Sequence, residues 1–320
     1  MENLEGNGEF AIAWPWEAGP LRWGRTAVMR VRNEARCLPW VMPSVLAAYD
    51  AVVLVDNGSD DGTPDLARKL ADELDAGDRL TVRDYPFRVA RAGEENLLAP
   101  ARSVHSLTWF YNWSFAQSRT SYSFKWDGDM ILTAEGVRVL RDLEWQLAPV
   151  HAIVAIPTHP LYVESDSVAW LDDGSAHLEA YGAPNRPEFR FLKAFEWETR
   201  DQPEWAERIE LPYGICLELK FLDSDEFSHW TSPESFLDNP RAVRKQREWA
   251  IFEAVRAGRP GDIKGLRRVE APEGTHVIQH VIDTNRSTAS LSTTHRSTTH
   301  RPTPHRSTTE TPDGAPGGVR

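Results

Sequence analysis

The sequence contains only two cysteines, Cys37 and Cys216, in 320 residues. A disulfide scaffold or a CxxC metal site would need more cysteines or closer spacing, so the sequence favours two reduced thiols. The chain also lacks a basic excess, because 48 acidic residues outnumber 36 lysines and arginines and give a formal net charge of -12. This balance argues against a nucleic-acid partner, which needs a basic surface, but it allows a single bound nucleotide.

Long apolar runs are absent as well. No stretch reaches the roughly 18 to 20 residues that span a bilayer, so we expect no transmembrane segment. The start of the chain, Met1 to Phe10, lacks the basic residues and the apolar stretch of a signal peptide. Together these absences predict a cytoplasmic protein.

Strand and helix patterns alternate along most of the chain. The expected strands are 26–31, 51–55, 80–85, 121–126 and 151–157, and the expected helices are 38–49, 63–74, 103–117 and a segment after Thr133. This order predicts an α/β fold with a Rossmann-like, mostly parallel sheet flanked by helices. We expect an irregular lead-in over residues 1–25, a single domain over 26–283 and a disordered tail of low complexity over 284–320.

Two acidic clusters directly follow expected strands. The segment from Asp56 to Asp61 follows 51–55, and Asp127-Gly128-Asp129 follows 121–126. Parallel strands end at one edge of a sheet, and α/β proteins bind ligands at that edge. We therefore expect the two clusters to meet at one site, although about 70 residues separate them.

Asp127 and Asp129 are spaced like a metal-binding DxD pair. Two carboxylates in a tight turn can give oxygen ligands to one hard divalent cation, Mn²⁺ or Mg²⁺. The cation would relieve their mutual repulsion and leave coordination positions open for diphosphate oxygens. His229 and His276 are candidates for a further ligand.

Two other uses of the first cluster fit its sequence poorly. An EF-hand loop that starts at Asn57 would have Arg68 at its twelfth position, where a bidentate glutamate is required. A phosphate-attacking aspartate of the haloacid-dehalogenase type normally has a second aspartate two residues later, and Gly58 occupies that place. The first cluster is therefore either a ligand site or a simple turn.

Three ordered segments resemble glycosyltransferase family 2. They are Val28–Glu34, Val53–Thr63 and Lys125–Asp129, and the resemblance extends over about a third of the chain. It implies a GT-A fold and a nucleoside-diphosphate sugar donor of the UDP or GDP type. It also divides the expected domain into a nucleotide-binding half, 26–133, and an acceptor-side half, 134–283.

The resemblance implies roles for several side chains after the first two strands. Asn33 and Glu34 would lie at the nucleoside pocket. Asp56 would face the base, and Asp60 would lie near the base or the ribose. The substrate-binding set implied in this way is Asn33, Glu34, Asp56, Asn57 and Asp60.

The same resemblance makes Asp127 and Asp129 the metal-binding pair and implies a later carboxylate that deprotonates the acceptor hydroxyl. No clear Glu-Asp pair follows the DxD. Strand alternation around Trp197 puts Glu198 on the side that could face a cleft, so we expect Glu198 to be this base. Trp126 is expected to stack on a sugar ring. Other carboxylates in the same region are Glu196, Asp201 and Glu218.

The sequence thus predicts a metal-assisted, inverting transfer of a sugar to a carbohydrate or other hydroxyl acceptor. Two alternatives stay open. A sugar-phosphate nucleotidyltransferase could use a similar sheet, although it normally has a glycine-rich loop after the first strand, and Arg30–Glu34 has no glycine. A non-catalytic GT-A relic that binds a nucleotide or sugar would be consistent with the unclear base.

Overall fold

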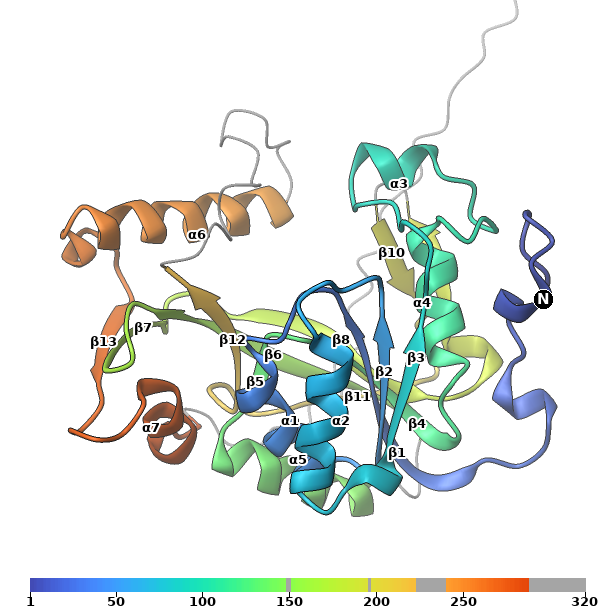
Figure 1. Ribbon diagram of the computed structural model, residues 1–320, viewed down its shortest axis with the longest axis horizontal. Helices are drawn as coiled ribbons and strands as arrows, with labels where there is room; N and C mark the ends of the chain where they lie inside the picture. Colours follow the sequence, from blue (N-terminus) through green and yellow to red (C-terminus); the bar gives the residue numbers. More distant parts are fainter. Residues whose placement is uncertain (148–150, 195–196, 223–239, 288–320) are drawn as a thin grey trace, which may run out of the picture.

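The computed structural model describes residues 1–147, 151–194, 197–222 and 240–287. Its strands are β1 (Arg22–Val31), β2 (Ala51–Asp56), β3 (Leu80–Asp84), β4 (Thr120–Asp127), β5 (Met130–Leu132), β6 (Ala152–Val163), β7 (Val168–Asp172), β8 (His177–Pro184), β9 (Phe191–Ala194), β10 (Trp197–Arg200), β11 (Glu207–Glu210), β12 (Cys216–Phe221) and β13 (Leu266–Glu270). Its α-helices are α1 (Leu38–Ala48), α2 (Thr63–Glu73), α3 (Glu94–Leu98), α4 (Leu107–Phe115), α5 (Ala134–Leu147), α6 (Pro240–Arg256) and α7 (Val277–Thr284). Helices flank one large curled sheet, so the expected α/β fold class is confirmed (Figure 1).

The parallel half of the sheet holds both acidic clusters. Strand β1 lies between β2 and β4 and pairs in parallel with both, and β3 follows β2. Beyond β4, strand β8 is antiparallel to both β4 and β6, while β12 is parallel to β6. Because the direction reverses twice, β6 and β12 end at the same rim as β1, β2 and β4.

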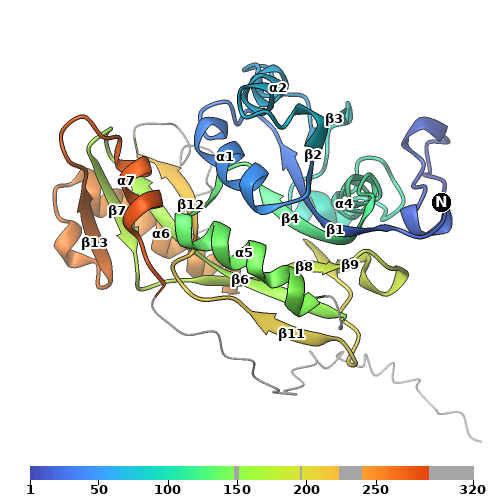
Figure 2. The same cartoon turned by 90° about the horizontal axis from the view of Figure 1, so that it is seen from below.

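Alternation along β1 and β4 gives the sheet an apolar core face and a more polar face, on which Val28 also packs with Phe115 and Phe191. Met29 and Trp126 belong to the large buried core, which also includes side chains from α1, α2, α5 and α7. Their chain neighbours Arg30 and Asp127 point to the other face, since successive strand residues alternate. Arg30 there contacts Tyr111 of α4. Figure 2 shows α5 and α7 in front of the sheet and α6 behind it.

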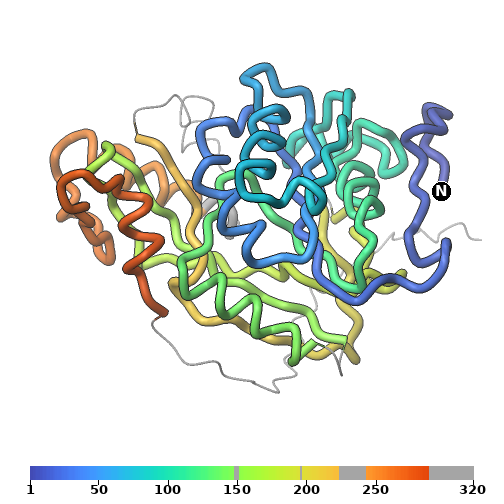
Figure 3. The backbone as a smooth tube through the Cα atoms, turned by 60° about the horizontal axis from the view of Figure 1, so that its bottom comes forward, coloured from blue at the N-terminus to red at the C-terminus, as the bar shows by residue number. Residues whose placement is uncertain are grey.

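The N-terminal segment packs against α4. Phe10, Ile12 and Trp14 are buried in a second apolar cluster with Trp109 and Trp113 of α4. The indole N–H of Trp109 also donates to the carbonyl oxygen of Phe10 at 3.1 Å. Figure 3 shows this segment beside α4, at one end of the molecule. Strand β1 already begins inside the expected lead-in.

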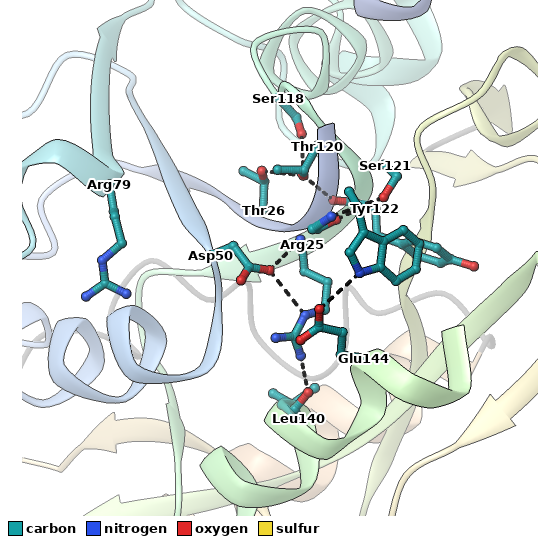
Figure 4. A network of polar contacts seen from close by, with 12 residues as sticks. Arg25, Thr26, Asp50, Arg79, Ser118, Thr120, Ser121, Tyr122, Leu140 and Glu144 are labelled. Atoms are coloured by element: carbon teal, nitrogen blue, oxygen red, sulfur yellow. Dashed lines mark hydrogen bonds and ion pairs between the residues drawn. The ribbon is translucent and has the colours of Figure 1, made fainter. Parts of the chain in front are cut away.

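A buried arginine fixes the start of the central strand (Figure 4). Arg25 is 3% exposed, and its backbone N–H donates to Asp50 Oδ2 at 2.8 Å. Its guanidinium contacts the same carboxylate at 3.4 Å and donates to the carbonyl oxygen of Leu140 in α5. Beside it, the hydroxyls of Thr26 and Thr120 lie 2.7 Å apart and join β1 to β4. These contacts anchor the strands whose opposite ends carry the acidic clusters.

At the other end of the described chain, Ser287 is held against α5. Its backbone N–H and its hydroxyl donate to the Glu135 carboxylate at 2.8 and 2.9 Å. Residues 288–320, most of the expected tail, lie outside the described residues. Among the helices that the structure describes, none has the length and apolar character needed to cross a membrane.

Candidate functional site

The two acidic clusters end strands that flank β1. Val31 of β1 is in register with Asp56 of β2, and the preceding residue, Arg30, is in register with Asp127 of β4. The expectation that both clusters reach one rim of the sheet is therefore confirmed.

Asp56 organises the loop that follows β2. Its Oδ2 accepts hydrogen bonds from the backbone N–H groups of Gly58 and Ser59 at 3.2 and 3.1 Å, and its Oδ1 accepts one from the Ser59 hydroxyl. The Asn57 amide donates to the carbonyl oxygens of Tyr85 and Phe87 at 2.8 and 2.7 Å. The side chains of Asp56 and Asn57 thus fix the conformation of the loop that follows β2.

The loops after β1 and β2 are bonded to each other. Asn33 has a left-handed backbone, with φ of 60°, and its backbone N–H donates to the Ser59 hydroxyl at 2.8 Å. Its side-chain oxygen accepts from the backbone N–H of Asp60 at 2.9 Å. The Glu34 N–H donates to the Thr63 hydroxyl at 2.8 Å. The expected nucleoside-binding residues therefore form one preorganised unit, and the Asp60 carboxylate is exposed at its tip.

Each carboxylate of the DxD turn faces a cation. Arg30 Nη2 lies 3.0 Å from Asp127 Oδ1, and Lys220 Nζ of β12 lies 3.3 Å from Asp129 Oδ2. The same ammonium is 2.7 Å from Glu218 Oε1. Burial opposes the charge on Glu218, yet Lys220 lowers the pKa of this carboxyl to about 2. Positive charge is therefore already in place around the DxD.

Glu34 brings a third carboxyl group to this turn. It lies against the α-carbon of Gly128, between the two aspartates. Burial raises the pKa of Glu34 to about 8, and the negative charge of Asp129 adds to the shift. Burial beside Asp129 thus favours the protonated form of Glu34.

A partly buried ion pair that the sequence analysis missed involves Lys125, two residues before Asp127 in β4. Lys125 Nζ is 2.6 Å from Glu179 Oε1 of β8. Burial opposes both charges, but Lys125 holds the pKa of Glu179 far below its usual range, while Tyr111, then Asp127 and Glu179, raise the pKa of Lys125. A lysine two residues before the DxD, within the strand that ends there, was the available signal.

Glu198 reaches the same polar face of the sheet from β10. The hairpin formed by β9 and β10 is fixed to α4, where the Asn112 side chain exchanges two hydrogen bonds with the backbone of Phe191 at 2.8 and 2.9 Å. Burial disfavours the charge on Arg30, yet Tyr111, then Asp127 and Glu198, raise its pKa. The Glu198 carboxylate is half-buried, and its charge acts on the arginine that holds Asp127.

Trp126 does not take the expected position at a sugar. It is fully buried in the core, and its indole N–H donates to the carbonyl oxygen of Met130 at 3.0 Å. Because Asp127 faces the polar side, alternation turns Trp126 to the apolar side. His276 starts α7, where its Nδ1 accepts from the Ile278 N–H and its Nε2 faces Asp166 at 3.4 Å. His229 and Glu196 lie outside the described residues.

The donor chemistry of the DxD turn fits a hard divalent cation. Magnesium is commonly held by one or two carboxylates together with substrate phosphates, so Asp127 and Asp129 would suffice as protein ligands. Over residues 1–147, 151–194, 197–222 and 240–287, no three His, Cys, Asp or Glu side chains are grouped so that they could hold a metal ion. Two carboxylates together with substrate phosphates are a usual ligand set for such a cation.

Comparisons with known proteins give distant similarities. No protein-family model matches the chain, and no match was found among curated proteins. S. aureus TarS, residues 1–349, is similar at 17% identity over 44% of this chain and 36% of that chain, with a TM-score of 0.30. Glucosyl-3-phosphoglycerate synthase from Mycobacterium tuberculosis, solved with Mn²⁺, UDP and glucosyl-3-phosphoglycerate, is similar at 19% identity over 45% of each chain, with a TM-score of 0.28. The chain thus matches less than half the length of either structure.

Proposed function

We propose that the chain is a glycosyltransferase that moves a sugar from a nucleoside-diphosphate sugar, of the UDP or GDP type, to an acceptor hydroxyl. The observation that carries this proposal is the placement of Asp56 and Asp127 on either side of β1, at one rim of a parallel sheet. Such a rim is where α/β folds bind nucleotides. In a GT-A fold with family 2 chemistry, these two positions belong to the base and the diphosphate.

The interlocked loops after β1 and β2 would hold the nucleoside. Asn33 and Asp60 are hydrogen-bonded to each other, so nucleoside binding would cost little entropy for ordering the two loops. The exposed Asp60 carboxylate could accept hydrogen bonds from ribose hydroxyls. Asp56 and Asn57 would keep the loop in shape next to the base.

The diphosphate would lie over the DxD turn. Asp127 and Asp129 would hold Mn²⁺ or Mg²⁺, which offsets the charge that grows on the leaving diphosphate. Arg30 and Lys220 stand beside these carboxylates and are near enough to add positive charge at the same place. Preorganised charge of this kind stabilises a transition state because it needs no rearrangement during the reaction.

Glu198 would act as the base. Glu179 and Glu218 are poor proton acceptors, because each is bonded to a lysine that lowers its pKa. Glu198 makes no hydrogen bond or ion pair through its carboxylate within the part of the chain that the structure describes. It would take the proton of the acceptor hydroxyl while the oxygen bonds to the anomeric carbon and the bond to the diphosphate breaks. This direct displacement inverts the anomeric configuration.

The test is a donor panel of UDP-glucose, UDP-galactose, UDP-N-acetylglucosamine and GDP-mannose with MnCl₂, assayed for nucleoside diphosphate release. We expect slow hydrolysis of at least one donor, and loss of this activity in the Asp127→Asn/Asp129→Asn double variant. Release of pyrophosphate from a nucleoside triphosphate and a sugar phosphate would instead support a nucleotidyltransferase. Inertness toward every donor that binds would support a non-catalytic relic and overturn the proposal.

A further inference from the structure

A small cavity lies on the polar face of the sheet, where α4, the β9–β10 hairpin and the N-terminal segment meet. It has about 20 Å³ of free volume, and its lining includes Trp14, Ser123, Phe191 and Arg200. Ser123 precedes Asp127 by four residues in β4, so the two side chains lie on the same face, about 13 Å apart along the strand. The cavity is therefore separate from the DxD turn.

Arg200, at the end of β10, is buried with only part of its guanidinium bonded. It is 7% exposed, and its guanidinium carbon lies 4.7 Å from the ring centroid of Phe115 and 4.8 Å from that of Phe191. Its Nη1 donates to the carbonyl oxygen of Ser123 at 3.4 Å. In the part of the chain that the structure describes, its Nε and Nη2 are buried and have no hydrogen-bond partner. The ring contacts do not replace these bonds, because an aromatic ring is only a weak acceptor.

Nε and Nη2 form the edge of a guanidinium that binds a carboxylate through two parallel hydrogen bonds. Two other arginines of this chain use that edge in this way. Arg247 contacts the two oxygens of Asp172 through Nε at 2.8 Å and Nη2 at 2.6 Å, and Arg267 contacts those of Asp173 at 2.6 and 3.4 Å. At Arg200 the same edge lacks a carboxylate among the described residues.

The surroundings of Arg200 favour an anion. Burial lowers the pKa of Arg200 to about 9, and the negative charge of Glu179 opposes this shift only in part. The buried hydroxyl of Ser123 lines the same cavity and has no hydrogen-bond partner within the described ranges. It is able to donate a hydrogen bond. A negatively charged acceptor would therefore stabilise both the buried cation and the unused hydroxyl.

Two further arginines line the cavity. The charge of Arg186 is partly offset, because its guanidinium lies 3.3 Å from Glu188 and also donates to His151 Nε2 at 2.8 Å. Arg190 is exposed, and its Nε donates to the carbonyl oxygen of Pro187 at 2.8 Å. Among the described residues, no Asp or Glu lines the cavity, so an anion would meet positive charge there.

We propose that this cavity binds the carboxylate group of a small organic acid. The two oxygens lie on the Nε–Nη2 edge of Arg200, and the Ser123 hydroxyl donates a further hydrogen bond. A free volume of about 20 Å³ is room for little more than one water-sized group, so the rest of the ligand lies outside, at Trp16 and Arg190. Because the edge of Arg200 is buried, the exposed Arg190 side chain must swing aside, which breaks its surface hydrogen bond to Pro187.

The test is the urea midpoint of the full chain in the presence of acetate, benzoate or succinate, at constant ionic strength and without divalent cations. Since a ligand of the native state raises its stability by mass action, we expect at least one carboxylate to raise the midpoint saturably, and its neutral amide to have no effect. Inorganic phosphate and sulfate should also have no specific effect, because their four oxygens need more space than the cavity has.

The variants locate the site. Arg200→Lys keeps the positive charge but loses the two-donor edge, so it should weaken carboxylate binding by about tenfold or more. Ser123→Ala should weaken it by about threefold or more, the usual effect of one lost hydrogen bond. Arg259→Lys, at an exposed arginine elsewhere, is the matched control and should bind like wild type. The midpoint of each variant without ligand shows whether it folds, and Ser123→Ala decides if Arg200→Lys does not fold.

Three results would overturn the assignment: no carboxylate raises the midpoint, phosphate or sulfate binds as tightly as the carboxylates, or the Arg200 and Ser123 variants bind like wild type. The proposal does not depend on the proposed function, because the nucleotide would lie at the rim of the sheet. Asp127→Asn/Asp129→Asn should therefore bind the carboxylate as wild type does. Loss of binding in this double variant would place the anion at the DxD turn and contradict the proposal.

Discussion

Glu34 packs so closely on Gly128 that a β-carbon added to this glycine would lie 2.5 Å from Glu34 Cγ. The loop after β1 and the DxD turn after β4 therefore fit together only when residue 128 has no side chain. This contact joins the nucleoside end of the proposed site to its metal end. It also explains why a glycine separates the two aspartates.

Gly128→Ala should weaken nucleoside diphosphate binding in the presence of Mn²⁺ by about tenfold or more, because Glu34 must move and take the DxD turn with it. The global fold should survive with a loss of roughly 1–3 kcal/mol, as for other overpacked sites. Titration calorimetry with UDP and GDP measures the first effect and urea unfolding the second. Gly261→Ala, at a glycine with open space around it and without a left-handed φ, controls for the loss of a glycine. Wild-type affinity in Gly128→Ala would show that the two loops act independently.

Glu198→Gln should reduce sugar transfer by about 10² to 10⁴-fold, the usual effect of losing a general base. Nucleotide affinity should stay within about twofold of wild type, since the amide keeps the shape of the carboxylate. Initial rates with saturating donor and calorimetry with UDP measure the two quantities. Glu207→Gln, an exposed position on β11, serves as the control. A variant that keeps its full rate would remove Glu198 from the mechanism.

Glu179 should make the protein sensitive to acid. Its folded pKa lies below the ordinary value of 4.5, so its contribution to stability is present above that value and is lost as the pH falls below it. Glu179→Gln should therefore flatten the decline of unfolding free energy between about pH 5 and pH 2. At pH 7 it should cost about 1.5–3 kcal/mol, because Lys125 loses a charged partner. The exposed Glu73→Gln should change stability by no more than about 0.5 kcal/mol. A pH profile in Glu179→Gln as steep as in wild type would contradict this account.

Asp50→Asn should destabilise the fold and leave the candidate site unchanged. The buried Arg25 guanidinium would lose its charged partner, and because the Asp50 side chain is 38% exposed, water offsets part of the loss. We expect about 1–3 kcal/mol, seen as a lower urea midpoint with an unchanged slope. Nucleotide affinity should not change, since Asp50 lies at the opposite end of β1 from the acidic clusters. Unaltered stability would mean that the Arg25 network does not anchor the strand.

The parallel half of the fold and its acidic clusters could be predicted from sequence. Short apolar strands such as Ala51–Asp56 end directly at aspartates, and parallel pairing then brings those ends to one rim. The prediction that Trp126 contacts a sugar was wrong, because a residue next to a rim-facing aspartate points the other way. Its aromatic character suggested a sugar contact, but alternation places it in the core.

The second half of the site could not be predicted in this way. Lys220 meets Asp129 from 91 residues further along the chain, and Glu179 meets Lys125 from 54 residues further along. Both contacts depend on strands that pair with β6, since β12 is parallel to it and β8 antiparallel. The sequence of β6 shows no clear period because all twelve residues are buried. Without alternation between exposed and buried residues, neither the register nor the partner of these strands is visible in the sequence.

The central claim is that the two aspartate clusters serve a single nucleotide and its cation. Calorimetry of UDP and GDP, with and without MnCl₂, on wild type and on Asp127→Asn/Asp129→Asn tests it most directly. The account predicts that Mn²⁺ strengthens binding of at least one nucleoside diphosphate by about tenfold or more in wild type and has no effect in the double variant. Metal-independent binding in wild type, or equal enhancement in both proteins, would contradict it.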